Sequence, residues 1–345
     1  MSVRLTVVVS AALVSTCAFA HHSFAPHFDA SKPVDISGIV TEYEARNPHS
    51  YLHIAAVDEN GRTQEYICES HGTTQLTRNG ISRDMLSKGT RLRVTGSQSR
   101  NNPYMCFFDA VDFLDGRVVG VNGPRGGPPA RAAAPARNDI FGTWLLAPNP
   151  NRSTSGPQPM MQHLTAAGRA AMEAYDPFTD DPTFRCDPVA IRRVWGAPGT
   201  PLSITREADR VVLRHEWMDV VRIVDLNLSE HPQDGPRTSL GHSIGRFEGD
   251  TLVIETANYS AGVLNQYVEQ PGQPTRGLLH SDALTSVERL SFDAARQRLV
   301  VEISLEDPLF FKQPFPASRA EYAPSDLAIE PFNCSPENQH GPIRE

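Results

Sequence analysis

The segment 118–138 divides the 345-residue chain into two parts. It contains Gly-Pro-Arg-Gly-Gly-Pro-Pro followed by Ala-Arg-Ala-Ala-Ala-Pro-Ala-Arg, and it offers almost no large apolar side chain for a core. Glycine and proline at this density are typical of linkers. A chain of this length is long enough for two domains with cores of their own. We therefore expect one domain at residues 21–117, a linker at 118–138 and a second domain at 139–334.

The first twenty residues have the pattern of a secretory signal peptide. A positive charge at Arg4 precedes an unbroken apolar run from Leu5 to Val14 and the small residues of Ala18-Phe19-Ala20. The apolar run is too short to remain as a membrane anchor. Cleavage after Ala20 makes His21 the first residue of the mature chain. The pattern predicts a periplasmic or secreted protein without a membrane span.

The cysteines fit an oxidising compartment. Of the five, Cys17 lies within the signal, and four remain in the mature chain: Cys68, Cys106, Cys186 and Cys334. An even number in an exported protein predicts two disulfides. Lipidation of Cys17, which follows a sequence loosely similar to a lipobox, is the alternative to cleavage after Ala20, and it would leave His21 internal.

The charge balance argues against two classes of partner. The chain has 32 basic and 40 acidic residues, a formal net charge of −8, and no stripe of basic side chains. Nucleic acid and anionic membrane surfaces are bound through such stripes. We therefore expect neither as a partner, and the P-loop and dinucleotide-binding fingerprints are also absent from the sequence.

The first domain has the pattern of a small β-barrel. Its expected strands are Val34–Tyr43, Ser50–Val57, Thr63–Glu69, Thr90–Thr95 and Met105–Phe113. Asp58-Glu59-Asn60-Gly61 predicts a hairpin turn, because Asn and Gly accept the positive φ that such turns need. Residues 73–86 have helical spacing with a break at Gly80. Three strands, a helix and two strands is the order of an OB-like five-stranded barrel.

The sequence pattern of the second domain predicts a larger antiparallel β-barrel or sandwich with one helix. We therefore expect the chain as a whole to be mainly β. The helix is expected at His163–Tyr175, with an apolar stripe at Leu164, Ala167, Ala171 and Tyr175. Short strands separated by tight turns favour antiparallel pairing. The strands are expected at Leu202–Arg206, Val211–Trp217, Asp219–Leu226, Ile244–Phe247, Thr251–Glu255, Thr285–Phe292, Leu299–Leu305 and Leu309–Phe315. Gly142-Thr143-Trp144 resembles the entry of a lipocalin barrel, and residues 335–345 are expected to form a loose polar tail.

Several motifs resemble two families whose activities are not characterised. His21-His22-Ser23-Phe24, Asn47-Pro48-His49-Ser50 and Lys88-Gly89-Thr90 resemble a family of small exported bacterial proteins. The run from Leu240 to Val253, which contains Gly-His-Ser-Ile-Gly-Arg-Phe-Glu-Gly-Asp-Thr-Leu-Val, resembles a second, secreted family. His280-Ser281, Glu288-Arg289 and Glu306-Asp307-Pro308 add to the second match. The resemblances imply membership of these two families, but they do not imply an activity.

Histidines in the first domain form a candidate metal site. A hairpin closed at residues 58–61 places His49 opposite or diagonal to residues 70–72, which include His71. His53 lies four residues along the same strand, roughly 13 Å from His49 at about 3.3 Å per residue, too far to share an ion. A terminal His21 adds both its amine and its ring, and such a nitrogen-rich set favours copper or zinc. The alternative is a frayed polar terminus with His49 bonded to backbone.

Polar residues of the second domain form a second candidate site. Arg222, His242, His280, Glu288 and Arg289 lie in or beside apolar strands. One of Glu288 and Arg289 must face inward in a regular strand, and an inward Glu288 near His280 would make an acid/base pair of an enzyme. The alternative is a buried salt bridge between Glu288 and Arg222.

The aromatic residues Trp144, Trp195, Trp217, Phe310 and Phe311 either line a cavity for a small apolar ligand or form core. A further alternative is a scaffold that binds a protein or glycan through the OB-like face. We expect a binding protein, with the metal on the first domain and the ligand contacts of the second at Trp144, Trp217, Arg222, His242 and Arg289.

Overall fold

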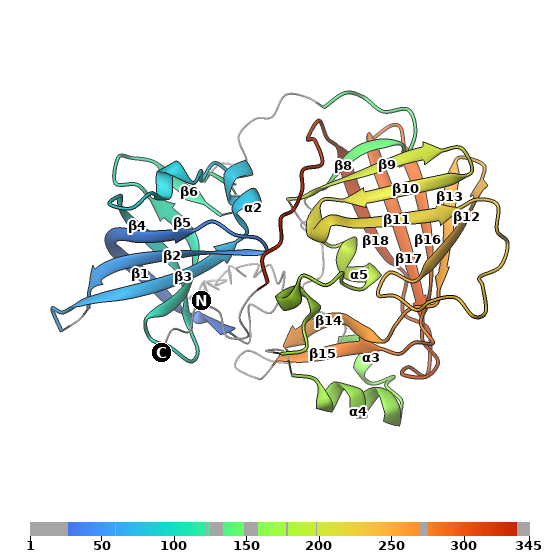
Figure 1. The fold of residues 1–345 in the computed structure, drawn as a ribbon, viewed down its shortest axis with the longest axis horizontal. Helices are drawn as coiled ribbons and strands as arrows, with labels where there is room; N and C mark the ends of the chain where they lie inside the picture. Colours follow the sequence, from blue (N-terminus) through green and yellow to red (C-terminus); the bar gives the residue numbers. More distant parts are fainter. Residues whose placement is uncertain are drawn as a thin grey trace, which may run out of the picture.

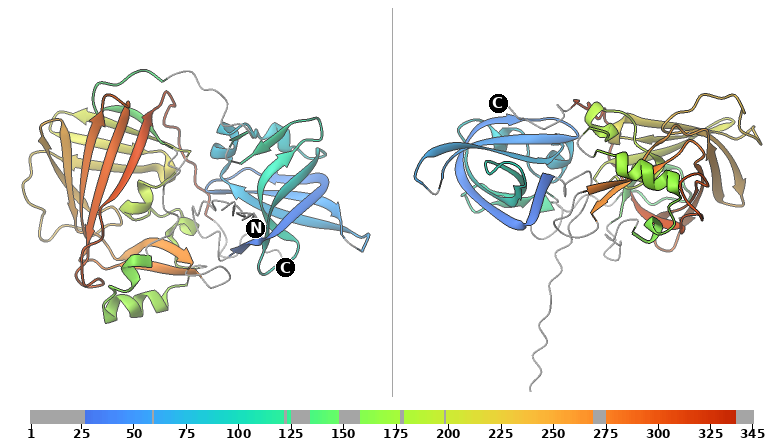
Figure 2. Two further views of the ribbon diagram at one scale, coloured as in Figure 1. Left: turned by 180° about the vertical axis from the view of Figure 1, so that it is seen from behind. Right: turned by 90° about the horizontal axis from the view of Figure 1, so that it is seen from below.

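The computed structural model describes residues 27–58, 60–121, 123–124, 134–147, 158–176, 179–197, 199–268 and 275–336. The expected signal peptide and His21 lie outside these residues, as do the middle of the expected linker and the tail beyond residue 336. Two β bodies stand side by side, and the carboxy-terminal segment runs between them (Figures 1 and 2). The expected mainly β fold class is confirmed.

The small body is a ring of five strands with one helix. The strands are β1 (Phe28–Glu44), β2 (His49–Val57), β3 (Thr63–His71), β4 (Arg91–Ser99) and β5 (Met105–Asp112). They pair in the order β3-β2-β1-β4-β5, and a parallel pairing of β3 with β5 closes the ring. The Cys68–Cys106 disulfide joins these two strands where the ring closes. This is the OB-like order expected from the sequence.

The segment between β3 and β4 covers one end of the small ring. It contains α2 (Thr73–Arg78) and a short 3₁₀ helix, η1 (Asp84–Leu86). Leu76, Ile81 and Leu86 are fully buried in the ring's core, which explains why this stretch has helical spacing in the sequence. Beyond β5, the sheet continues into β6 (Val118–Gly120) and β7 (Gly123–Pro124), so the first residues of the expected linker pair with the small domain.

The large body is a closed barrel of nine strands. Its order is β10-β11-β12-β13-β16-β17-β18-β8-β9. A closed ring with an odd number of strands cannot be antiparallel throughout, and here the parallel pair is β11 with β12. The strands are β8 (Gly142–Leu146), β9 (Pro201–Glu207), β10 (Arg210–His215), β11 (Val220–Asp225), β12 (His242–Glu248), β13 (Thr251–Ala257), β16 (Thr285–Asp293), β17 (Arg298–Glu306) and β18 (Ser318–Pro324).

Three elements of the large body differ from the sequence-based expectation. Residues 309–315 are not a strand, because the Asp307 carboxylate accepts the backbone N–H groups of Leu309 and Phe310 and turns the chain. The last strand of the barrel is instead β18, at residues where the sequence pattern predicted no strand. A two-stranded sheet of β14 (Gly262–Val268) and β15 (Thr275–His280) is inserted between β13 and β16.

The helix expected at His163–Tyr175 is present but shorter, and a separate short helix precedes it. Residues 158–161 form α3 (Gln158–Met161), and α4 (Ala166–Ala174) begins at Thr165, whose hydroxyl accepts the N–H of Gly168. The buried face of α4 is Gly168 and Met172 rather than the expected Ala167 and Ala171. A Cβ at position 168 would lie 2.4 Å from the Phe310 carbonyl oxygen, so glycine permits this close approach. Two short helices follow, η2 (Pro182–Arg185) and α5 (Ile191–Val194).

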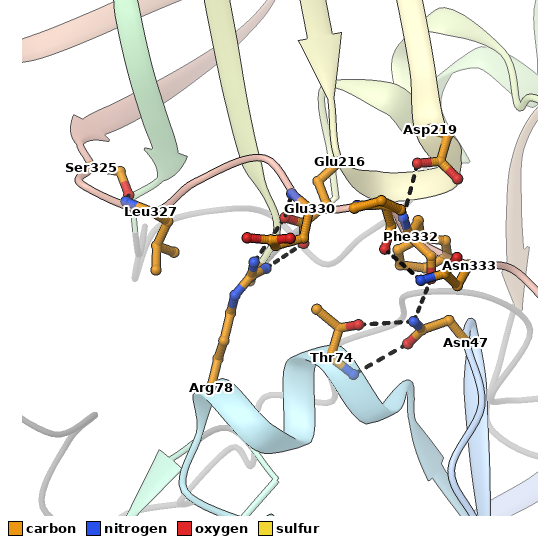
Figure 3. Close-up of polar contacts among 12 residues, drawn as sticks. Asn47, Thr74, Arg78, Glu216, Asp219, Ser325, Leu327, Glu330, Phe332 and Asn333 are labelled. Carbon is orange, nitrogen blue, oxygen red and sulfur yellow. Dashed lines mark hydrogen bonds and ion pairs between the residues drawn. The ribbon is translucent and has the colours of Figure 1, made fainter.

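A segment that we call the C-terminal strap, residues 325–336, joins the two bodies (Figure 3). The Cys186–Cys334 disulfide ties it to the large body. On the small-body side, the Asn47 amide donates to the Phe332 carbonyl, and the Ser335 N–H donates to the Asn47 carbonyl over 2.7 Å. The first residue of the expected loose tail is therefore held.

A buried ion pair lies beside the strap. The Arg78 guanidinium of α2 pairs with Glu216 of the large body, whose side chain is 0% exposed. The Glu216 carboxylate also accepts the Glu330 N–H of the strap at 3.0 Å. One carboxylate therefore links both bodies and the strap.

Candidate histidine site and large-domain pocket

The two candidate metal ligands of the described region lie opposite each other. His49 begins β2 and His71 ends β3, and the two are direct partners in the antiparallel register. They therefore share one face of the sheet, with Glu69 two residues before His71 on the same face. The predicted juxtaposition of His49 and His71 is confirmed. Within the described part of the chain, no three or more His, Cys, Asp or Glu side chains are arranged to hold a metal ion.

The surroundings keep His71 neutral. Burial, and next the neighbouring His49, lower the pKa of His71 to about 4. The Phe107 ring contacts the His71 imidazole edge-on, with ring centroids 5.6 Å apart. A carboxylate oxygen of Glu69 lies 3.1 Å from His49 Nδ1.

His53 takes no part in this pair. Its Nε2 lies 2.8 Å from a carboxylate oxygen of Glu44, and its side chain is buried. The sequence analysis excluded His53 from a site shared with His49, and the contact of His53 with Glu44 is consistent with that exclusion.

The interior of the large barrel contains a buried ion pair. Arg222 of β11 and Glu288 of β16 both point inward, and their side chains are 1% and 0% exposed. Two guanidinium nitrogens of Arg222 donate to the two carboxylate oxygens over 2.9 and 2.6 Å. Trp195 also donates to Glu288 through its indole nitrogen. Both oxygens of Glu288 are therefore engaged, which is the salt-bridge alternative expected from the sequence.

Polar neighbours complete this network. Arg222 donates to the hydroxyls of Ser243 and Thr256, which also bond to each other over 2.9 Å. The Tyr259 hydroxyl bonds to Ser286 over 2.7 Å, and burial raises the pKa of Tyr259 to about 12. A neutral tyrosine therefore lies at the edge of the network.

His280 lies apart from Glu288, at the end of β15. The Tyr259 ring contacts the His280 imidazole edge-on, with centroids 6.0 Å apart, while the Tyr259 hydroxyl faces the Arg222–Glu288 network. Tyr259 thus lies between the two members of the expected acid/base pair. His280 instead lines a pocket of about 380 Å³ outside the barrel, together with Asp180, Arg185 and Gly262.

The other expected ligand contacts are dispersed. Trp144 is fully buried in the barrel core and donates to the Ile140 carbonyl, whereas Trp217 packs in a separate cluster around Val189. His242 pairs with another histidine, His231, with 3.0 Å between their Nδ1 atoms. Arg289 faces outward and pairs with Glu248. The structure does not bring these residues to one site.

Residues 241–245, Gly-His-Ser-Ile-Gly, match the Gly-x-Ser-x-Gly pattern of hydrolase nucleophile elbows. In those enzymes the serine stands on a sharp turn from a strand to a helix. Here Ser243 lies within β12, and its hydroxyl bonds to Thr256 and Arg222. The match therefore does not build an elbow.

The pocket residues other than His280 were not foreseen. Asp180, Arg185 and Asp187 lie in and beside the short 3₁₀ helix η2 between α4 and α5, where the sequence shows no strand or helix periodicity. The density of aspartates around Cys186 is the signal that the sequence does offer.

Comparison with known proteins relates the first part of the chain to a family. Residues 8–105 match the model of a family described as "Family of unknown function (DUF6152)". The matched region includes the His21–Phe24 and Asn47–Ser50 motifs and ends at the first residue of β5. The resemblance of the large domain to a second family stays a prediction. No curated protein and no solved structure matches the chain. None of the helices in the described ranges is both long and apolar enough to cross a membrane.

Proposed function

We propose that this chain is an exported protein that binds a transition metal, copper or zinc, on its small domain. The ligands in the proposal are His49, His71 and the amine and ring of His21 freed by signal cleavage. The observation that carries it is the direct pairing of His49 with His71 across the β2–β3 hairpin. Two facing imidazoles and one bidentate terminal histidine give four nitrogen ligands.

The chemistry of the pair suits this role. A metal binds the lone pair of a neutral imidazole. His71, whose pKa is lowered to about 4, is neutral at pH 7, so no additional proton has to leave before a metal binds. Glu69 stands in the outer position that carboxylates occupy around metal-bound histidines, where they orient the ring and raise its basicity. Nitrogen ligands favour copper over zinc by the Irving–Williams order, and zinc remains a good fit.

Neither alternative is favoured by a specific observation. An enzyme that uses His280 and Glu288 as an acid/base pair would need a free carboxylate, and Glu288 is bonded to Arg222 and Trp195. Among the described residues, no feature of the small barrel specifically supports a scaffold that binds a protein or glycan. A periplasmic or secreted location accompanies the metal proposal, and the two disulfides are compatible with it.

The test uses untagged protein purified from its exporting cell. Mass spectrometry should give His21 as the first residue, and metal analysis should give one bound copper or zinc ion. His49→Ala and His71→Ala should each weaken binding at least tenfold in calorimetric titrations, and Glu69→Gln should weaken it by about 10–100-fold. His163→Ala, a change on the large domain, is the control.

An amino-terminal extension retained before His21 should abolish tight binding, because the α-amine becomes an amide. If the mature chain begins elsewhere, or if the His49→Ala protein retains the metal as the wild type does, the proposal is wrong.

A further inference from the structure

A pocket on the large domain, separate from the histidine pair, has the features of a ligand site. It is formed by η2, the start of β14 and the end of β15, and its volume is about 380 Å³. This lies at the lower end of the 300–1,000 Å³ range of small-molecule pockets. Its polar lining includes His280, Arg185, Asp180, Asp187 and Ser260.

Within the described part of the chain, one nitrogen of His280, a residue that lines this pocket, has no hydrogen-bond partner. The residue is 1% exposed, and its Nδ1–H donates to the Ser281 carbonyl over 2.9 Å. A carbonyl only accepts, so Nδ1 carries the proton and Nε2 of the neutral ring carries a lone pair. Burial lowers the pKa of His280, which maintains this neutral form. Among the described residues, nothing donates a hydrogen bond to Nε2.

Glycine at position 262 leaves the space before Nε2 open. Gly262 is the register partner of His280 in the β14–β15 sheet. A Cβ at position 262 would lie 3.1 Å from Nε2 and would fill this space. A buried acceptor beside a residue that lacks a side chain is the arrangement expected where a ligand's donor group enters.

The surrounding groups are held in place. The Asp307 carboxylate accepts the backbone N–H and the hydroxyl of Ser281, which fixes the segment after His280. On the opposite side, Arg185 donates to Asp187 at 2.9 Å and to the Thr179 carbonyl at 3.1 Å. The buried His280 side of the pocket is therefore preorganised, which lowers the entropy loss on binding, whereas Arg185 and Asp187 have side-chain exposures of 56% and 54% and lie at the pocket's surface.

The charge of the lining selects the class of ligand. Two carboxylates, Asp180 and Asp187, stand against one guanidinium, Arg185, while His280 is neutral. Carboxylates and a lone-pair nitrogen all accept hydrogen bonds, so the lining favours a molecule rich in donors and disfavours an anion. We propose that this pocket binds a small polyhydroxylated molecule, neutral or cationic and of the size of a hexose or hexosamine, with one of its hydroxyl or ammonium groups donating to His280 Nε2.

A chemical probe tests whether Nε2 is accessible. Diethyl pyrocarbonate acylates neutral imidazoles, and a histidine that is 1% exposed should resist it unless a pocket admits the reagent. We expect peptide mass spectrometry to find His280 modified in the wild type. Gly262→Ala should reduce the modification several-fold. An unmodified His280, or equal modification in both proteins, overturns the open pocket.

Three probes with one carbon skeleton test the ligand class: D-glucosamine, D-glucose and D-gluconate. We expect binding by the cationic and neutral sugars and none by the anion, measured by calorimetry and by chemical-shift changes in the full chain. His280→Ala and Gly262→Ala should each reduce affinity at least tenfold, and His163→Ala should not change it. Where His280→Ala fails to fold by circular dichroism, Gly262→Ala carries the comparison.

Tightest binding by gluconate, no binding by any of the three probes, or unchanged affinity in the Gly262→Ala protein would each refute the assignment. Metal content of the same samples is measured in parallel, so that this result is separate from the proposal for the small domain.

Discussion

At the scale of single residues, His215 couples the stability of the large domain to pH. The side chain is 5% exposed, and burial, with the nearby Arg222 as a second cause, lowers its pKa from 6.5 to about 3. Between these two values the unfolded chain binds a proton at this position that the folded chain does not. The free energy of unfolding therefore falls as pH falls below 6.5, by about 1.4 kcal/mol per pH unit for this histidine, and the loss is complete below about pH 3.

We expect His215→Phe to remove this contribution. The His215 imidazole meets the Trp195 ring edge-on with centroids 5.1 Å apart, and phenylalanine preserves an aromatic contact there. Urea unfolding between pH 7 and pH 4.5, followed by tryptophan fluorescence, should show a slope smaller by about one proton than in the wild type. His163→Phe, at a histidine nearer the surface, serves as the control. An unchanged slope in the His215→Phe protein would disprove the coupling.

The Arg222–Glu288 pair should dominate the polar energetics of the barrel interior. Glu288→Gln leaves the Arg222 charge buried without its counterion, and breaking a buried pair destabilises by about 3–5 kcal/mol. The adjacent Arg289→Ala breaks an exposed pair with Glu248, and such pairs contribute about 1 kcal/mol or less. Denaturant unfolding of both variants checks the difference. Equal losses would mean that Glu288 is better solvated than its burial implies.

Pairs across a hairpin could be foreseen from the sequence, whereas residues in loops could not. The turn at 58–61 fixes the strand register, so the juxtaposition of His49 and His71 follows by counting. The pairing of Cys68 with Cys106 follows from the neighbouring third and fifth strands of the predicted barrel. In contrast, Arg185 and Asp187 flank Cys186, and their placement depends on its disulfide to Cys334, which is 148 residues away in sequence. No local sequence pattern encodes that placement.

At the scale of elements, the C-terminal strap depends on the Cys186–Cys334 disulfide. The two cysteines are 148 residues apart in sequence, and closing a loop of that length restricts the unfolded chain. Removal of a native disulfide of this kind lowers the free energy of unfolding by about 2–5 kcal/mol. We expect Cys186→Ser/Cys334→Ser to lose stability in this range.

The same double variant should become sensitive to proteases within the strap, as measured by mass spectrometry of limited digests. Cys68→Ser/Cys106→Ser is the matched control, because it removes a disulfide inside the small barrel and leaves the strap tethered. Cleavage in the strap at the wild-type rate would show that Asn47, Asp219 and Glu216 hold the strap without the disulfide.

The sequence pattern missed strands that are determined mainly by pairing with neighbouring strands rather than by their own residues. In β18, Arg319 and Glu321 alternate with Ala320 and Tyr322 over a short stretch, and the strand is fixed by pairing with β17 and β8. The opposite error occurred at residues 309–315, an apolar run in which the Asp307 side chain takes the backbone hydrogen bonds that a strand would need. Phe311 and Phe315 are nevertheless buried, so the apolar residues of this stretch contribute to the core without forming a strand.

At the scale of the whole molecule, the Asn47-Pro48-His49-Ser50 segment of the small domain also contributes to its contact with the large one. Asn47 of the Asn-Pro-His-Ser motif bonds to Thr74 of α2 and to the strap residue Phe332. Gly72 makes room for it, since a Cβ there would lie 2.2 Å from the Asn47 carbonyl oxygen of the side chain. Asn47 thus positions the histidine hairpin against the strap, so the proposed metal site lies beside the contact between the two bodies.

The Arg78–Glu216 ion pair should decide whether the two bodies stay together. Arg78→Ala leaves the fully buried Glu216 carboxylate without a cation, and such a charge regains solvation most readily if the interface opens. We expect small-angle X-ray scattering of the variant to show a larger maximum dimension than the wild type. Arg78→Ala/Glu216→Gln should be more compact than the single variant, because the uncompensated charge is gone. Arg62→Ala removes an exposed guanidinium that pairs with Asp58 inside the small domain, away from the contact between the bodies, and should scatter as the wild type does. Superimposable curves for wild type and Arg78→Ala would assign the domain contact to the strap, and the Asn47→Ala variant should then open the molecule instead.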